Sequence, residues 1–413
     1  MRVGIARESR AGERRVAATP ETVEQLVGLG LDVRVESGAG ECAGYPDSAF
    51  SKAGARIAER LVVEDLDVLG HVRPLDPQLA GRLHSGAITI GLASPGTELE
   101  TVRVLARGGV TAFALELVPR ISRSQSMDAL SSQALVSGYR AVLEAAIRFP
   151  RFFPLYMTAA GTIPPAKVLV LGAGVAGLQA IGTAKRLGAR VSANDIRPSS
   201  AEEVASIGGT FISLDVTTAE TAGGYARELS QDRGARQREL LAPHVASSDV
   251  LITTAAIPGR AAPLLVTKEM VAAMRPGSVV IDLAAESGGN VEGVIAGEDV
   301  LVPVQDGQVT VVGLADAPSA VATDASRLYA KNVANLLALM TTNGVVAPDF
   351  SDEIVAATCL THDGEVRHAP TAAALAEAAD GALVPGETQR DDVHETREDD
   401  LHEAQERPAN EED

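Results

Sequence analysis

One segment limits the fold of this chain more than any other. The apolar run KVLVL (167–171) leads directly into Gly172-Ala173-Gly174-Val175-Ala176-Gly177, and a helical pattern then continues to about Leu187. In such a turn the first glycine permits a tight bend, the second lets backbone N–H groups approach a pyrophosphate, and the third lets the helix pack on the strand. The pattern predicts a parallel α/β sheet with a dinucleotide at the helix start. A glycine-rich turn without a ligand is the alternative.

An acidic residue follows at the position that this interpretation requires. The next predicted strand, RVSAN, leads to Asp195, which lies 18 residues after Gly177. A carboxylate there is expected to bind the ribose 2′-OH of the adenosine and to repel a 2′-phosphate, which favours NAD(H). Arg197, two residues further on, keeps NADP(H) open as the alternative.

A second polar cluster, RISRSQSMDALSSQ (120–133), follows the predicted strand VTAFALE. Ligands of open α/β sheets bind at the carboxyl ends of strands, so this cluster is a candidate site. Arg120 could hold a carboxamide oxygen, and Asp128 could orient Arg120. Helix capping is an equally good explanation for Asp128 and Ser131, whereas Arg120 and Gln125 are harder to explain as structural residues.

A long polar stretch lies between Leu214 and Asp249. It is too long for an ordinary connection, and such loops are often functional lids. Gly223 and Gly224 would supply hinge freedom, and Tyr225 could close over a cofactor. A plain surface loop is the alternative.

The order of strand and helix patterns predicts the domain organisation. Strands alternate with helices before residue 120 and again after Lys167, and a segment with four prolines (149–165) marks a junction. We therefore expect an α/β protein with two Rossmann-like, doubly wound parallel-sheet domains joined by the long helices 131–148 and 319–340. The expected boundaries are 1–133 plus 320–380 for the N-terminal domain, 140–318 for the dinucleotide domain and 386–413 for a disordered acidic tail.

Charge and composition exclude several classes of function. The net charge is −19, residues 387–413 carry twelve acidic side chains against three arginines, and aromatic residues make up 3% with no tryptophan. Such a chain repels phosphate backbones and anionic lipids, so we expect neither a nucleic-acid partner nor direct membrane insertion. We find no signal peptide and no apolar run of membrane-spanning length. The two cysteines, Cys42 and Cys359, form no disulfide framework and suit a reducing compartment.

A few further polar residues have open interpretations. The histidines and cysteines show no metal-ligand spacing, so we predict no metal site. His71 could reach the cleft or serve the structure, and Asp282 could cap the turn after its strand. Glu286 is expected near the cofactor edge. For Arg15, both anion binding and simple solvation are possible.

Several segments together resemble the NAD(H)-binding component of proton-translocating NAD(P) transhydrogenase. They are Arg7-Glu8 with ERRVAATP, RISRSQSMDALSSQ, GAGVAGLQAIGTAKRLGA, TTAAIPGRAAPLLV and GSVVIDLAAESGGN, and the resemblance extends from residue 1 to about 380. It implies that Arg120, Gln125, Asp128 and Ser131 form the catalytic set at the nicotinamide, and that Tyr225 belongs to a mobile loop. The cofactor-binding set is then Gly172, Gly174, Val175, Ala176, Gly177, Asp195, Ile196, Arg197, Gly224, Tyr225, Gln237 and Ala256.

The resemblance also implies an assembly. In that family the component is a homodimer that binds NAD(H) and docks on a beta subunit that binds NADP(H), together with a membrane-spanning subunit. The implied enzyme is a Re/Si-specific NAD(P)+ transhydrogenase that is catalytically incomplete without these partners. It would be cytoplasmic and attached peripherally, through its partners, to the inner face of the cell membrane.

Alanine dehydrogenase, which has the same architecture, is the nearest alternative, and a non-catalytic NAD(H)-sensing module is another. By resemblance, the dehydrogenase's lysine position holds Arg73, the segment TIGLASPG lacks its histidine, and Glu286 replaces its aspartate. Hydride transfer between two nicotinamide rings takes no proton from either substrate, so no acid–base pair is needed. Arg15, which would suit a substrate carboxylate, keeps the dehydrogenase alternative open.

Overall fold

A computed structural model describes residues 1–214, 231–256 and 259–381 of the chain. The chain divides into two compact units, Met1–Leu375 and Ala376–Asp413. The second unit is described only at the end of helix α12 (Ala369–Gly381), and the predicted acidic tail lies outside the described residues. The sheets and cavities below all belong to the first unit.

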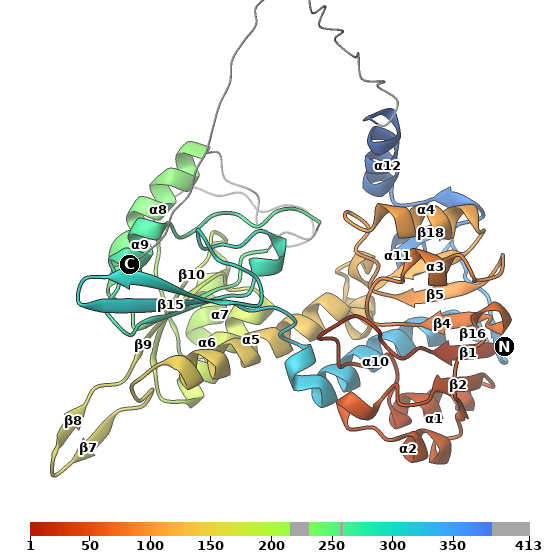
Figure 1. The fold of residues 1–413 in the computed structure, drawn as a ribbon, viewed down its shortest axis with the longest axis horizontal. Helices are drawn as coiled ribbons and strands as arrows, with labels where there is room; N and C mark the ends of the chain where they lie inside the picture. Colours follow the sequence, from red (N-terminus) through yellow and green to blue (C-terminus); the bar gives the residue numbers. More distant parts are fainter. Residues whose placement is uncertain (215–230, 257–258, 382–413) are drawn as a thin grey trace, which may run out of the picture. The chain divides into compact units, whose positions relative to one another are not determined.

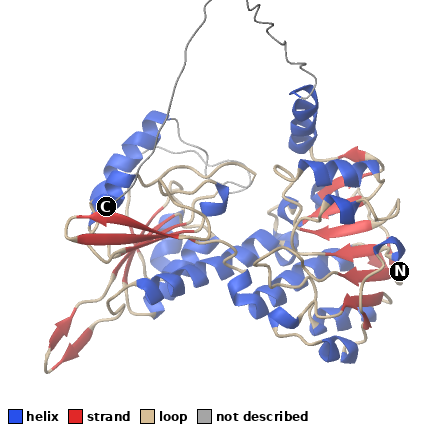
Figure 2. Ribbon diagram, viewed as in Figure 1, coloured by secondary structure: helices blue, strands red, loops and turns tan. Residues whose placement is uncertain are grey.

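An eight-stranded sheet forms the N-terminal α/β domain (Figures 1 and 2). Its strand order is β19-β18-β6-β5-β4-β1-β2-β3, with the first six strands of the chain parallel to one another. Strand β18 returns from far along the sequence and pairs antiparallel with β6. The strands are β1 (Arg2–Ile5), β2 (Asp32–Glu36), β3 (Arg56–Ala58), β4 (Val68–Gly70), β5 (Ile88–Gly91), β6 (Thr111–Ala114), β18 (Cys359–His362) and β19 (Glu365–Val366).

Alternating apolar residues give this sheet two buried faces. Val68 and Phe113 belong to one core cluster, whereas the neighbouring Leu69 and Ala112 belong to another. This is the period-2 pattern of a strand that is covered on both sides. Helices α1 (Pro20–Gly28), α2 (Asp47–Lys52) and α10 (Ala322–Leu339) contribute to the first cluster, and α3 (Pro77–Ala80) and α4 (Leu99–Arg107) to the second.

A seven-stranded sheet forms the second domain, in the order β11-β10-β9-β12-β13-β15-β14. All neighbours are parallel except β14, which pairs antiparallel with β15. The strand order reverses between β9 and β12, and ligands of open α/β sheets bind at such a switch point. The strands are β9 (Lys167–Leu171), β10 (Arg190–Asn194), β11 (Thr210–Phe211), β12 (Val250–Thr253), β13 (Val279–Asp282), β14 (Asp299–Val304) and β15 (Gly307–Gly313).

Helices cover both faces of the second sheet. Val168 and Val170 pack in a cluster with the first set of helices, whereas Leu169 and Leu171 pack with the second set. The first set comprises α5 (Ala129–Arg148), α6 (Val175–Arg186) and α7 (Ser200–Ser206), and the second comprises α8 (Gln231–Ala246) and α9 (Lys268–Ala272). Both domains are therefore doubly wound, and the predicted fold class is confirmed; the exact domain boundaries stay a prediction.

The long helices predicted at 131–148 and 319–340 are present as α5 and α10, the latter preceded by the short helix η6 (Ser319–Val321). Within the described ranges, no helix has the length and apolar character that a membrane crossing requires. The remaining elements are η1 (Glu41–Ala43), η2 (Val63–Asp65), η3 (Leu115–Leu117), η4 (Ser122–Met127), η5 (Ala285–Ser287), α11 (Glu353–Thr358), β7 (Tyr156–Thr158), β8 (Gly161–Ile163), β16 (Thr341–Thr342) and β17 (Val345–Val346).

The proline-rich segment 149–165 contains the antiparallel hairpin β7–β8, and its prolines flank the paired residues instead of interrupting them. One expectation about a loop needs correction. The polar stretch 215–248 is not a continuous loop, because its second half forms α8. There Gln237, Leu241 and Val245 recur every four residues on the buried side of the helix, a period masked in the sequence by many charged neighbours.

Candidate functional site

The glycine-rich turn joins β9 to α6 at the switch point of the second sheet. Gly172 has φ +96°, a backbone conformation that L side chains rarely adopt. A Cβ added to Gly177 would lie 1.9 Å from the Gly172 carbonyl oxygen, so the helix packs directly on the turn. Gly174 has no heavy atom within 4 Å of the position of an added Cβ, which leaves the middle of the turn open.

The first turn of α6 lacks a side-chain cap. Its N-cap residue is Gly174, which has no side chain to accept from the first-turn N–H groups. By contrast, Thr19 caps α1 and Asp128 caps α5. Uncapped N–H groups at a helix start, together with the helix dipole, form a binding place for an anion such as a pyrophosphate.

Asp195 lies immediately after β10, beside this turn. Its side chain is 8% exposed; Oδ2 accepts from the Ala173 N–H at 2.7 Å, and Oδ1 accepts from the Arg197 N–H at 2.8 Å. The Arg197 guanidinium also donates to Asp195, from Nε to Oδ1 at 3.1 Å. The carboxylate is thus held in a fixed orientation by neighbours on both sides of the turn.

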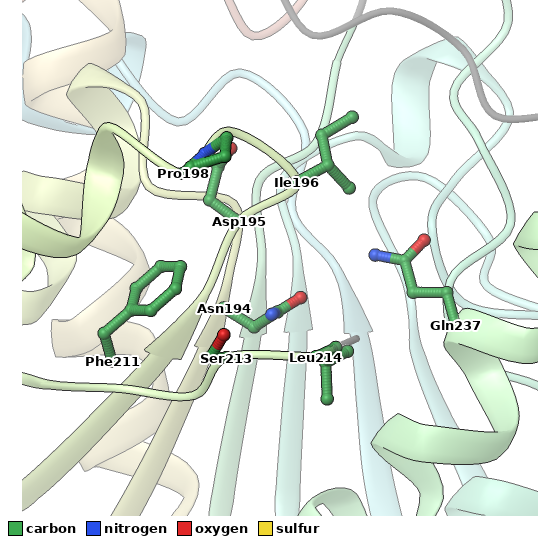
Figure 3. A pocket seen from close by; sticks show the side chains of 8 residues that line it. All are labelled: Asn194, Asp195, Ile196, Pro198, Phe211, Ser213, Leu214 and Gln237. Carbon is green, nitrogen blue, oxygen red and sulfur yellow. The ribbon is translucent and has the colours of Figure 1, made fainter. Parts of the chain in front are cut away.

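A small pocket of about 80 Å³ opens next to Asp195 (Figure 3). Asn194 and Asp195 stand at the end of their strand, and Gln237 extends from α8 on the opposite side. Gln237 is 6% exposed, so its amide is aimed into the pocket and away from solvent. Phe211 and Leu214 supply apolar surface of the kind that an adenine ring can contact.

A cavity of about 1610 Å³ joins this region to the Arg120 cluster. Of the residues predicted from the sequence, it is lined by Arg120, Ser131, Gly172, Gly174, Val175, Ala176, Asp195, Ile196, Arg197, Gln237 and Ala256. Gly177, Gln125 and Asp128 do not line it, and Gln125 is exposed. Gly224 and Tyr225 lie outside the described residues. Glu286 lines the cavity, as expected for a residue at its edge.

The loop that carries Arg120 is built by helix capping. Asp128 accepts from the Ser131 N–H at 2.8 Å and from the Ser131 hydroxyl at 2.6 Å, so the capping interpretation of these two residues is confirmed. Asn332 of α10 donates from Nδ2 to the Ser126 carbonyl oxygen at 2.9 Å. Arg123 donates to both carboxylate oxygens of Asp352, at 2.6 and 2.9 Å. These contacts hold the loop beside the cavity.

Two family models match the chain. The model described as "Alanine dehydrogenase/PNT, C-terminal domain" covers residues 141–369, and "Alanine dehydrogenase/PNT, N-terminal domain" covers residues 4–137. The chain belongs to this family. The resemblance found in the sequence motifs is therefore confirmed at the level of the alanine dehydrogenase/PNT family.

Individual relatives place the chain within the alanine dehydrogenase/PNT family. A Rhodospirillum rubrum protein, named as the first part of NAD(P) transhydrogenase subunit alpha, is 47% identical over 380 residues, covering 89% of this chain and 98% of that protein. A crystal structure of transhydrogenase from Sinorhizobium meliloti superposes with a TM-score of 0.77 at 46% identity, covering 89% of this chain and 98% of that one. Alanine dehydrogenase of Bacillus subtilis is 32% identical, covering 71% of this chain and 72% of that protein.

At the carboxyl end of the N-terminal sheet, Arg15 lies in a buried network of hydrogen bonds. This arginine is 4% exposed and donates to Glu13 from Nε at 2.9 Å and from Nη2 at 2.6 Å. Its Nη1 donates to Gln133 Oε1 at 2.9 Å. Arg15 is therefore not solvated, and the solvation interpretation was wrong; its guanidinium is already paired with Glu13.

Glu13 is the centre of this buried network. It also accepts from Arg73 Nε at 2.7 Å and from the Ser319 hydroxyl at 2.8 Å. Burial alone would raise the pKa of the Glu13 carboxyl, but hydrogen bonds and the charge of Arg15 outweigh burial and lower the pKa to about 2. Arg73 also pairs with Asp316. The arginine at the expected lysine position is thus occupied by the chain's own carboxylates.

Two further carboxylates, both half-buried, support loops at the same edge. Glu8 accepts from the Val72 N–H at 2.6 Å and the Arg73 N–H at 3.2 Å, and burial raises its pKa to about 7. Glu116 accepts from the backbone N–H groups of Ala93 and Ser94, and burial raises its pKa as well. His71 is buried with Nδ1 2.7 Å from the Arg73 carbonyl oxygen, so its role is structural.

Sequence reasoning missed two residues that shape the floor of the cavity. The Thr254 hydroxyl donates to the Gly172 carbonyl oxygen at 3.1 Å, and Asn290 donates from Nδ2 to the Ala255 and Pro263 carbonyl oxygens at 2.8 Å. Asp282, predicted to cap a turn, accepts from the backbone N–H groups of Ala284, Asn290 and Val291. A polar residue directly after a buried strand was the available signal for Thr254, as it was for Asp195.

Proposed function

We propose that this chain is the NAD(H)-binding alpha subunit of a proton-translocating NAD(P)+ transhydrogenase. It passes hydride between NADH, held in the large cavity, and NADP+ held by a partner subunit. The carrying observation is an open, uncapped glycine turn beside the nearly buried Asp195 carboxylate, in one cavity with Arg120 and Ser131. Relatives of 40–47% identity that bear the name NAD(P) transhydrogenase subunit alpha support the same assignment.

Each region of the cavity has a role in this proposal. The first-turn amides of α6 hold the pyrophosphate, Asp195 binds the adenosine ribose, and Gln237 and Ile196 border the adenine. Arg120 binds the carboxamide of the nicotinamide, and Asp128 positions Ser131 through their two hydrogen bonds. Gln125 is exposed on the same loop, where it would face the partner's cofactor. Gly224, Tyr225, Arg197 and Ala256 complete the NAD(H) site.

The bound nicotinamide supplies the hydride chemistry, and the chain's residues need only bind and align it. No lysine is among the described residues that line the cavity. His368 does line it, but its Nδ1 lies 2.8 Å from the Thr371 hydroxyl and burial lowers its pKa. Arg15 and Arg73 are already paired with carboxylates of the chain, so an amino or oxo acid would find both guanidinium groups occupied. These contacts disfavour an alanine dehydrogenase activity.

The assembly also belongs to the proposal. An NADP(H)-binding beta subunit would bring its cofactor to the Arg120 loop, and a membrane-spanning subunit would couple hydride transfer to proton movement. The chain would be held at the inner face of the cell membrane through these partners. We further propose a homodimer, in which the hairpin β7–β8 contacts a second copy, because Phe152, Leu155, Tyr156 and Met157 are exposed there, Met157 by 75%.

Equilibrium binding of NADH and NADPH to the purified chain tests the cofactor assignment. We expect NADH to bind more tightly than NADPH, and Asp195→Ala to weaken NADH binding. Hydride exchange between NADH and an NADP analogue should appear only after the partner's NADP(H)-binding domain is added. Formation of NADH from NAD and alanine by the chain alone would refute the proposal in favour of an amino-acid dehydrogenase.

A further inference from the structure

Helix α5 runs from the Arg120 loop to the glycine turn. Its N-cap, Asp128, belongs to the loop, and Leu130, Ser131 and Ala134 line the large cavity. Ser131, Ala134 and Gly138 are spaced by three and four residues, so they lie on one face of the helix. That face extends about 10 Å from Ser131 to Gly138, given the rise of 1.5 Å per residue.

At Gly138 this face meets the backbone of α6. A Cβ added to Gly138 would lie 2.0 Å from the Ala176 carbonyl oxygen and 2.8 Å from the Ala176 carbonyl carbon. Real Cβ atoms essentially never come within 3.0 Å of a heavy atom, so only glycine permits this contact. Ala176 belongs to the first turn of α6 and itself lines the cavity.

The first turn of α6 is fixed on its other side as well. A Cβ added to Gly177 would lie 1.9 Å from the Gly172 carbonyl oxygen, so α6 cannot move towards β9. If a larger residue replaced Gly138, α5 would therefore have to retreat from α6. A separation of ordinary length requires a movement of about 1 Å, and interiors packed at crystal-like density transmit such a shift along a rigid helix.

We propose that Gly138 is a positioning residue that sets the distance between the pyrophosphate turn and the nicotinamide loop. This inference rests on the proposed function, because it assumes that one dinucleotide spans both places. Gly138 touches no cofactor itself. It acts through Ala176 near the middle of α5 and through Ser131 and Arg120 at the N-terminal end of the helix, and it thereby sets the distance between the two halves of the site.

The test compares Gly138→Ala with Gly182→Ala in the full chain. Gly182 also lies inside a helix, but the nearest atom to its added Cβ is Arg186 Nη1 at 3.8 Å, so alanine fits there. We measure the dissociation constants of NADH and AMP by equilibrium titration. Gly138→Ala should weaken NADH binding by about tenfold, the effect of losing a hydrogen bond to the nicotinamide end. AMP contacts only the second domain, so its affinity should change by less than about twofold.

The outcomes separate this inference from the proposed function. A wild-type chain that binds neither NADH nor AMP would overturn the proposed function. If the wild-type chain binds both ligands, two results would overturn the role of Gly138. In one, Gly138→Ala keeps the wild-type affinity for NADH. In the other, Gly138→Ala loses affinity for NADH and AMP equally. Gly182→Ala should bind both ligands with the wild-type affinity. If Gly182→Ala lost as much NADH affinity as Gly138→Ala, the inference would also be overturned.

A measurement without any variant covers the case in which Gly138→Ala does not fold. Hydrogen exchange of the wild-type amides in 129–138 is followed with NADH and with AMP. NADH, which engages both ends of this segment, should slow exchange there by several-fold more than AMP does. Equal protection by the two ligands would overturn the proposal.

Discussion

The carboxyl edges of the two parallel sheets are built alike and filled differently. In the second sheet this edge carries glycines, an uncapped helix start and the Asp195 carboxylate beside them. In the N-terminal sheet the same edge is filled with charged side chains that pair with one another or accept from backbone N–H groups. They follow β1, β4 and β6 and include Glu8, Glu13, Arg15, Arg73 and Glu116.

This difference shows how one fold can leave a helix start open to a ligand at one edge and satisfy loop N–H groups with its own carboxylates at the other. The start of α6 has no N-cap side-chain hydrogen bond and can bind an anion, whereas the N–H groups of Val72, Arg73, Ala93 and Ser94 already donate to Glu8 or Glu116. Buried polar groups must be satisfied, by a ligand or by the chain itself. We therefore expect substitutions at the N-terminal edge to change stability and substitutions at the second edge to change binding.

The largest effect is expected at Glu13. Glu13→Ala leaves Arg15 buried without its carboxylate partner, which should lower the free energy of unfolding by about 3–5 kcal/mol. Urea unfolding followed by circular dichroism measures this change. The control is Glu64→Ala, which removes the partner of Arg82 in an exposed pair and should leave stability close to the wild type. Equal destabilisation by both variants would contradict the importance of burial.

Gly174→Ala should change NADH binding and leave stability nearly unchanged. Nothing lies within 4 Å of its added Cβ and its φ of −75° suits alanine, so stability should change by no more than about 1 kcal/mol. A methyl group there would obstruct a bound pyrophosphate, and NADH affinity should fall on the order of 10- to 100-fold, about 1.4–2.8 kcal/mol. Gly28→Ala in α1, which is equally uncrowded, should leave binding unchanged. Unaltered NADH affinity in Gly174→Ala would remove the turn from the site.

The half-buried carboxylate of Glu8 predicts a pH dependence of stability. Its pKa is raised by burial from 4.5 to about 7, so the folded state binds the proton more tightly than the unfolded state does. The contribution of protonated Glu8 to the free energy of unfolding is complete below pH 4.5 and is lost as the pH rises through 7. Glu8→Gln lacks this titration. Its free energy of unfolding should therefore rise by about 1–3 kcal/mol relative to that of the wild type between about pH 5 and pH 8.

Unfolding curves of the two proteins across this pH range check the prediction. Glu64→Gln makes the same charge change at an exposed site, where hydrogen bonding to Arg82 lowers the pKa, so its difference from the wild type should stay flat over the same range. A constant difference between Glu8→Gln and the wild type over that range would mean that Glu8 does not titrate there.

Local sequence patterns predicted the glycine turn at the second sheet, but they did not predict the charged network at the N-terminal sheet. The glycine turn, Asp195 and the cap formed by Asp128 each depend on residues close together in the chain. The network at Arg15 depends on Gln133, 118 residues away, and β18 pairs with β6 across most of the chain. A single sequence contains the charged residues of such a network but not their pairing. From the sequence alone, Arg15 therefore stays open between anion binding and simple solvation, although Glu13 lies only two residues before it.

The smallest effect is expected at the loop that connects the two edges. Arg123 of η4 donates to both oxygens of Asp352, and Asp352 also caps α11 by accepting from the Ile354 N–H at 2.8 Å. Arg82 and Glu64 form a pair of the same exposed, two-hydrogen-bond kind far along the chain from the loop. Exposed pairs of this type add little stability, so any specific effect of Arg123 must come from the position of the loop.

Arg123→Ala should therefore slow hydride transfer by about three- to tenfold, because misplaced reacting groups lose rate steeply with distance. Steady-state transfer in the presence of the NADP(H)-binding partner domain measures this, with Arg82→Ala as the matched control that keeps the wild-type rate. AMP binding should be the same in all three proteins, since AMP does not reach the loop. If both arginine variants transfer hydride equally fast, the tether to Asp352 does not position the loop, and the capping contact of Asp128 with Ser131 is sufficient to hold it.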